Sequence, residues 1–224
     1  MRVRVLRQSR GIEIENIVDW NEKHKLAKAE FECAVLSRKV LCDTSAGFIE
    51  RETHRNTTWQ QARFETCHHK WCDLSETDGG IAIINDSKYG AGFEKNRISL
   101  SLLRATIRPD VTSDIGKHSF CYMIFPHAGD AVNAKINNIA FQYNVPLVKS
   151  DEEWHMPLFS PLYLQAAKQS ESGEMTVIRL SEQDGRRGTI KLDRKVKVLN
   201  LLEEIQSETD EINYTPFEII TIGM

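Results

Sequence analysis

"SFCYMIFP", residues 119–126, alternates two sets of bulky side chains along a short segment. Successive residues of a β-strand point to opposite faces, so a period of two is typical of an extended chain. One face would carry Phe120, Tyr122 and Ile124, and the other would carry Cys121, Met123 and Phe125. The segment therefore predicts a strand within a sheet.

The same strand pattern recurs along the whole chain, while no long amphipathic helical pattern is evident. Residues 21–31, "NEKHKLAKAEF", fit a helix or a strand equally well. The other strand segments are "GIEIENIVDW" (11–20), "ISLSLLRAT" (98–106), "MTVIRLSE" (175–182), "GTIKLDRKVKVLNLL" (188–202) and "PFEIITIGM" (216–224). These segments predict an all-β fold.

A polar stretch, "AKQSESGE" at 167–174, interrupts the strand pattern near the C-terminus. Such a composition is typical of a linker or a long surface loop. We therefore predict two domains, a larger β-sandwich over residues 1–170 and a small terminal β domain over 171–224.

Composition narrows the classes of partner and the compartment. The net charge of −3 does not favour nucleic acid or an anionic membrane as a partner. No apolar run approaches the about 20 residues needed to span a bilayer. No signal peptide is recognised, and the five unevenly spaced cysteines do not resemble a secreted disulfide framework. Together these features favour the cytoplasm.

"CHHKWC", residues 67–72, holds four side chains that can bind zinc. If the segment is a strand, Cys67 and His69 lie on one face while His68 and Cys72 lie on the other. Because a tetrahedral site needs convergent ligands, we expect no metal site there. No complete catalytic motif is found elsewhere, so no catalytic residue is assigned.

"IAIINDSKYG", residues 81–90, ends an apolar run in a dense group of polar side chains. A turn needs only Gly or Asn, whereas this one adds a carboxylate, an ammonium and a phenol. Basic and aromatic side chains are also frequent between Arg51 and Arg104. They could bind a sugar, or they could cover apolar surface.

Several long segments resemble the C-terminal region of class II α-mannosidases, glycoside hydrolase family 38, nearest the cytosolic and bacterial branch. They are "VDWNEKHKLAKAEF" (18–31), "ERETHRNTTWQQARFETCHHKWCDLSE" (50–76), "GIAIINDSKYG" (80–90), "ISLSLLRATIRPD" (98–110) and "DIGKHSFCYMIFPHAGD" (114–130). Near the end, "VIRLSEQDGRRGTIKL" (177–192), "VLNLLEE" (198–204) and "PFEIITI" (216–222) resemble the last β domain of that family.

The resemblance implies part of a mutarotase-like supersandwich, incomplete at its N-terminus, followed by a smaller β-sandwich. It also implies a retaining hydrolase of α-linked mannose that uses zinc and an aspartate nucleophile. The family's zinc motif begins His-x-Asp in an N-terminal catalytic domain, and none of the seven histidines here precedes x-Asp. We therefore expect no cofactor in this chain, and zinc in a separate catalytic domain.

The resemblance also assigns candidate sugar-binding residues: Asn85, Asp86, Lys88, Tyr89 and Arg104. They would complete the mannose pocket and orient sugar hydroxyls by hydrogen bonds. The alternative is that the same charged loop only docks the catalytic domain.

Two further expectations concern partners. The chain could instead be a stand-alone carbohydrate-binding module. The face that meets the catalytic domain should be apolar, so the isolated chain should form homo-oligomers.

Overall fold

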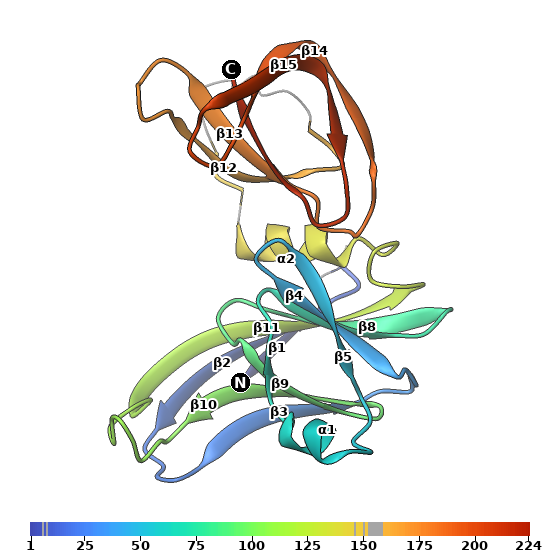
Figure 1. Cartoon of the computed structure of the whole chain (residues 1–224). Coiled ribbons are helices and arrows are strands. Elements are labelled where there is room, and N and C mark those ends of the chain that lie inside the picture. Colours follow the sequence, from blue (N-terminus) through green and yellow to red (C-terminus); the bar gives the residue numbers. More distant parts are fainter. Residues whose placement is uncertain (6, 8, 146, 150, 152–158) are drawn as a thin grey trace. The chain divides into compact units, whose positions relative to one another are not determined.

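The structure, a computed structural model, describes residues 1–5, 7, 9–145, 147–149, 151 and 159–224. The chain divides into two compact units. Unit 1 comprises residues 1–44 and 49–147, and unit 2 comprises residues 45–48 and 148–224. Strands dominate both units, and the helices of the described residues are α1 (Thr58–Ala62) and α2 (Ile136–Asn144) (Figure 1). The predicted all-β fold is confirmed.

The larger sheet of unit 1 has seven strands in the order β1-β2-β11-β8-β7-β4-β5. Its pairs are antiparallel, with β11 at Tyr122 opposite both Ile14 of β2 and Asn85 of β8. The strands are β1 (Arg2–Val5), β2 (Ile12–Trp20), β4 (Lys39–Thr44), β5 (Gly47–Glu52), β7 (Trp71–Ser75), β8 (Gly79–Asn85) and β11 (Gly116–Ala128).

The second sheet of unit 1 has four strands in the order β3-β10-β9-β6. Residues 21–31, whose sequence fits a helix or a strand equally well, contain most of strand β3 (Leu26–Glu32). The others are β6 (Thr66–Cys67), β9 (Gly90–Glu94) and β10 (Arg97–Arg104).

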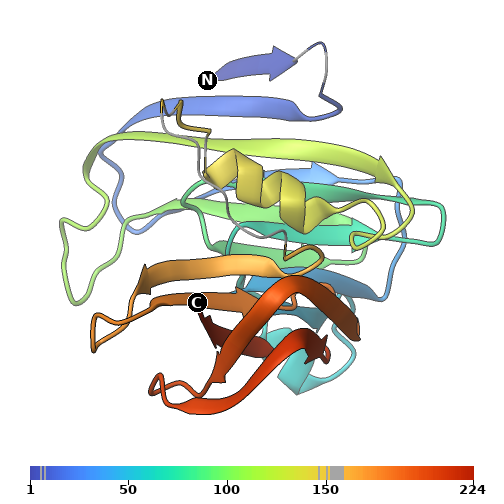
Figure 2. The ribbon, with the colours of Figure 1, turned by 90° about the horizontal axis from the view of Figure 1, so that it is seen from above.

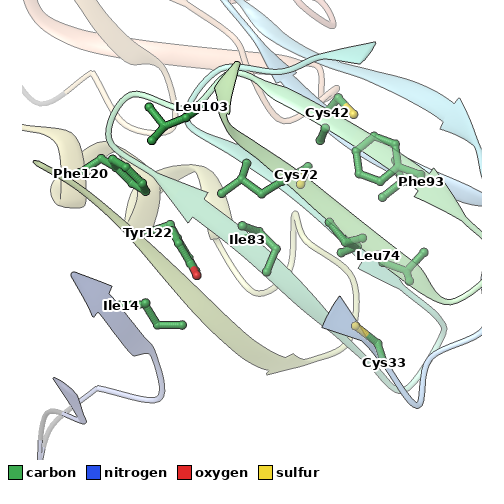
Figure 3. Close-up of a cluster of buried hydrophobic side chains, with 14 residues drawn as sticks. Ile14, Cys33, Cys42, Cys72, Leu74, Ile83, Phe93, Leu103, Phe120 and Tyr122 are labelled. Carbon is green, nitrogen blue, oxygen red and sulfur yellow. The ribbon is translucent and has the colours of Figure 1, made fainter. Parts of the chain in front are cut away.

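The two sheets of unit 1 enclose one apolar core between them (Figure 3). Phe120 and Tyr122 of β11 lie in this core, and Ile124 packs against it, as the period of two predicts. From the smaller sheet, Phe93 and Leu103 complete the packing. Unit 1 is therefore a two-layer β-sandwich.

The seven-stranded sheet extends beyond its four-stranded partner at the β1 edge. Val3 and Val5 pair directly with Ile14 and Ile12, so they share the core-facing side of the sheet. Nevertheless they are 54% and 73% exposed, whereas Ile14 is buried. The inner face of β1 is thus left uncovered by unit 1 itself.

Helix α2 packs on β7 and β8 of the larger sheet, and Figure 2 shows the helix lying over the strands of unit 1. Its buried residues are Ile136, Asn137 and Ala140. Trp71 of β7 donates its indole N–H to Asn137 Oδ1 at 3.2 Å, which ties the helix to the sheet.

Unit 2 contains one antiparallel sheet in the order β12-β13-β16-β14-β15. Its core includes Ile178, Leu180 and Ile222, which are fully or almost fully buried. The strands are β12 (Tyr163–Gln169), β13 (Thr176–Ser181), β14 (Gly188–Leu199), β15 (Ile205–Tyr214) and β16 (Ile219–Gly223).

The predicted boundary between residues 170 and 171 differs from the division observed at residue 147. Lys168 and Gln169 belong to β12 and pair with Val177 and Thr176 of β13. The polar stretch at 167–174 therefore forms the end of β12 and the turn to β13 within unit 2, which agrees with the surface-loop alternative and not with a linker. Turn and linker sequences share the same small polar residues, so composition does not separate them.

Candidate sugar-binding edge of unit 1

The segment 85–90 carries the chain from the end of β8 in the larger sheet to the start of β9 in the smaller one. It therefore crosses the edge of the sandwich. Gly90 pairs with Ser101 of β10, so the end of β10, with Arg104, lies toward the same edge. The structure thus brings segment 85–90 and Arg104 to one edge of unit 1.

Asn85 is completely buried and fastens this segment to the residues before β7. Its side-chain amide donates to His69 O at 2.8 Å, and its Oδ1 accepts from Lys88 N at 2.7 Å. Its backbone N–H donates to Lys70 O, and its carbonyl accepts from Asn144 Nδ2. With these bonds and no exposure, Asn85 has a structural role in this unit.

Asp86 is exposed and also helps to fix the segment. Its Oδ2 accepts from Cys121 N at 2.9 Å, and its Oδ1 accepts from Ser87 Oγ at 2.7 Å. The carboxylate therefore has a set orientation at the surface. Its remaining lone pairs can accept hydrogen bonds from hydroxyl groups.

Lys88 and Tyr89 each contact the ring of a neighbouring residue, Phe120 and His69 respectively. The Lys88 ammonium lies 4.4 Å from the centroid of the Phe120 ring, within the range of a cation–π interaction. The Tyr89 ring meets His69 edge to face, with centroids 5.9 Å apart, and its carbonyl accepts from His68 N. Tyr89 remains 53% exposed, so it can offer an aromatic edge and a phenol to a ligand.

Arg104 is exposed at the end of β10. Its backbone N–H donates to Asp114 Oδ2 at 2.7 Å, which fixes the main chain at this point. A guanidinium presents up to five N–H donors in a planar arrangement suited to neighbouring oxygens. Four of the five predicted residues, Asp86, Lys88, Tyr89 and Arg104, therefore retain some surface exposure.

The sequence interpretation of "CHHKWC" as one continuous strand is wrong. Residues 68–70 separate β6 from β7, so alternation does not hold across them. Cys67 is exposed, while Trp71 and Cys72 are both buried. Backbone bonds of His68 to Tyr89 and of Asn85 to Lys70 make residues 68–70 the support of the candidate site instead.

Asp43 is a buried acid in this support that sequence reasoning missed. Its Oδ2 accepts from both Lys70 N at 2.8 Å and Lys70 Nζ at 2.9 Å. Burial raises the pKa of the Asp43 carboxyl, and the Lys70 ammonium opposes that rise. The sequence gives no sign of this pair, because Asp43 lies in β4 and Lys70 lies between β6 and β7, far along the chain.

His68 lies in the same support and is only 1% exposed. Neither ring nitrogen has a hydrogen-bond partner among the residues that the structure describes. Burial lowers the pKa of His68 to about 4, so the imidazole is neutral at physiological pH. It acts here as a neutral, space-filling ring.

Within the described residues, no three His, Cys, Asp or Glu side chains gather as a metal site would require. Across the described ranges, no helix combines the length and apolar composition that crossing a bilayer requires.

Two sequence profiles match the chain, one in each unit. The glycosyl hydrolases family 38 C-terminal domain matches residues 1–112, and the glycosyl hydrolases family 38 C-terminal beta sandwich domain matches residues 161–222. The chain therefore belongs to glycosyl hydrolase family 38.

Similar proteins show which members of this family the chain resembles. Alpha-mannosidase 2C1 of Mus musculus is 34% identical over 227 residues, which cover 90% of this chain and 22% of the relative. Alpha-mannosidase G of Dictyostelium discoideum is 33% identical over 239 residues, covering 95% and 22% respectively. The chain thus corresponds to the C-terminal region of family 38 α-mannosidases, and it spans about a fifth of the length of these relatives.

A solved structure shares the fold. The crystal structure of an alpha-mannosidase from Enterococcus faecalis V583 superposes with a TM-score of 0.82 at 16% identity. The superposition covers 99% of this chain and 28% of that one. At this identity the likeness concerns the fold alone.

Proposed function

We propose that this chain is the non-catalytic C-terminal part of an enzyme that hydrolyses α-linked mannose from oligosaccharides. In that enzyme, Asp86, Lys88, Tyr89 and Arg104 complete the sugar pocket and dock the catalytic domain. The observation that carries the proposal is the rigid attachment of segment 85–90 through buried Asn85, with exposed polar groups held beside it.

The role of these residues is to orient the sugar rather than to transform it. Exposed carboxylate, phenol and guanidinium groups can bind hydroxyls of a mannose ring by hydrogen bonds. Groups that are fixed before binding lose little freedom when the sugar arrives, and this favours a reactive geometry. The nucleophile, the acid and the zinc ion belong to the catalytic domain in this proposal.

Arg104→Ala in the full-length enzyme tests the proposal. We expect kcat/KM for 4-nitrophenyl α-mannoside to fall about tenfold to 100-fold, because one charged donor to the sugar is lost. Arg97→Ala is the matched control, since Arg97 starts the same strand and pairs with Glu94 at the surface. Equal activity of both variants would contradict a pocket role for Arg104.

The alternative function is a stand-alone carbohydrate-binding module, and it makes the opposite prediction for the isolated chain. If half of the pocket lies in the catalytic domain, calorimetric titration of this chain with methyl α-mannoside should show no saturable binding. Saturable binding that Tyr89→Ala abolishes would favour the stand-alone module.

Two further parts of the proposal concern location and assembly. We propose a cytoplasmic enzyme, and the five cysteines, all of them free thiols, support a reducing compartment. We also propose that the isolated chain self-associates, supported by the uncovered Val3 and Val5. Light scattering that finds only monomer at high concentration would contradict self-association.

A further inference from the structure

Unit 1 contains a groove of about 790 Å³ that the proposed function does not use. Its lining residues come from β4, β5, β6, β9, helix α1 and the segments next to them. Charged side chains dominate its lining, with four Lys or Arg residues against three Glu residues. Neighbouring side chains form ion pairs with some of these charged groups and not with others.

Each of the three acidic side chains has a partner in or beside the groove wall. Glu50 pairs with Lys39, and Glu52 Oε2 accepts from Gln60 Nε2 at 2.7 Å. Glu65 pairs with Lys28 and accepts from Ser101 Oγ at 2.8 Å. Lysines thus neutralise Glu50 and Glu65, whereas Glu52 keeps its charge and is held by the amide of Gln60.

Two of the cationic side chains lack such partners. Arg55 pairs with Glu94 at 3.7 Å, but no hydrogen bond or ion pair within the described residues engages the guanidinium of Arg51 or Arg63. Arg51 Nε is moreover buried without an acceptor. Burial of Nε holds the Arg51 guanidinium in place, and its terminal nitrogens are the donors that remain for an incoming oxygen.

We propose that this groove binds a phosphate monoester of a sugar-sized molecule, with Arg51 and Arg63 holding the phosphate. Guanidinium groups match phosphate oxygens in planar, paired hydrogen bonds. A phosphate has three terminal oxygens and can serve two arginines, whereas one arginine already satisfies a carboxylate.

The size of the groove supports a ligand larger than phosphate alone. A volume of about 790 Å³ is within the usual range of small-molecule pockets. His54 and Thr66 line the same groove and can form hydrogen bonds with hydroxyl groups beside the phosphate. The proposal stands independently of the mannose pocket, which lies at a different set of residues.

Calorimetric titration of the full-length protein with mannose 6-phosphate, inorganic phosphate, mannose and glucuronate tests the inference. We expect saturable binding of mannose 6-phosphate and weaker binding of inorganic phosphate at the groove, whereas mannose should bind only in the proposed mannose pocket and be unaffected by the groove variants. Arg51→Gln and Arg63→Gln should each weaken mannose 6-phosphate binding at least about tenfold, the loss expected for one charge-assisted hydrogen-bonding group.

Arg10→Gln is the control, because Arg10 is an exposed arginine of unit 1 outside the groove. It should change the dissociation constant less than about twofold. If Arg51→Gln fails to fold, Arg51→Lys keeps the charge while removing the planar group, and should still weaken binding. Absence of saturable binding, binding unchanged in the Arg51 and Arg63 variants, or equal binding of glucuronate would overturn the proposal.

Discussion

Asp73→Ala should lower the free energy of unfolding of unit 1 by about 3 kcal/mol, the cost expected when one partner of a buried pair is removed. Asp73 is fully buried, and its Oδ2 accepts a hydrogen bond from His127 Nε2 at 2.6 Å. Its Oδ1 accepts from Ser75 Oγ at the same distance, 2.6 Å. The variant would leave both donors without an acceptor in the core.

The loss should also depend on pH. Burial lowers the pKa of His127, but the hydrogen bond and the negative charge of Asp73, together with backbone hydrogen bonds at Ala128 and Gly129, outweigh burial and raise the pKa above its ordinary 6.5. A raised pKa in the folded state stabilises the fold fully below pH 6.5, and this contribution is lost as pH rises through the folded value. Asp73→Ala removes the hydrogen bond and the charge of Asp73 that help to raise the pKa of His127, so the variant should lose this contribution to stability below pH 6.5.

The difference between wild type and Asp73→Ala should therefore be larger at pH 5.5 than at pH 8.5. Urea unfolding followed by tryptophan emission measures it, since Trp20, Trp59 and Trp71 all lie in unit 1. Asp19→Ala is the control, because Asp19 is exposed and, among the described residues, its side chain bonds only Asn21. A difference that is the same at both pH values would show that the pair is not charged.

Asn85→Ala should have the second largest effect, about 2 kcal/mol, because it leaves two partly buried backbone groups without hydrogen-bond partners. His69 O would lose its donor, and Lys88 N would lose its acceptor. The surface position of Tyr89 should become less fixed, since its carbonyl bond to His68 would be the main remaining link to this support. Urea unfolding measures the first effect.

Asn21→Ala provides the matched control for Asn85→Ala. Asn21 is exposed, and its side chain bonds the Asp19 side chain two residues earlier at 2.9 Å. Loss of such a surface contact should change stability by no more than about 0.5 kcal/mol. If Asn85→Ala unfolds at the same urea concentration as this control, Asn85 does not fasten the segment.

Strand positions were predictable where one face of the strand is buried. The period of two located β2, β10, β11, β13 and β14, because the core imposes that period on the side chains. Helix α2 was missed for a local reason. Its N-cap is Lys135 in the left-handed conformation with no side-chain cap, so the usual start signal is absent.

The candidate site was predictable in place but not in the role of each residue. Segment 85–90 and Arg104 do lie toward one edge of the sandwich, yet Asn85 is buried within the support. An asparagine that binds sugar hydroxyls and one that bonds the backbone use the same side-chain amide, so the residue type alone does not separate the two roles. Only the pairing of β8 with β7 and β11 decides which of the two Asn85 becomes.

Asp43 shows a second limit of sequence reasoning. Its partner Lys70 lies far along the chain, and the two meet because β4 pairs with β7 at Cys42 and Cys72. A long-range pairing of this kind depends on the register of the whole sheet. Nothing in the local pattern around either residue indicates it.

The unequal width of the two sheets of unit 1 bears on the order in which the unit comes apart. The inner face of β1 is exposed, whereas Leu74 of β7 and Ile83 of β8 are fully covered. Free energies of local opening follow the apolar area that each element buries. Unit 1 should therefore open as a graded series that begins at β1, with β7 and β8 forming the last cooperative block to open.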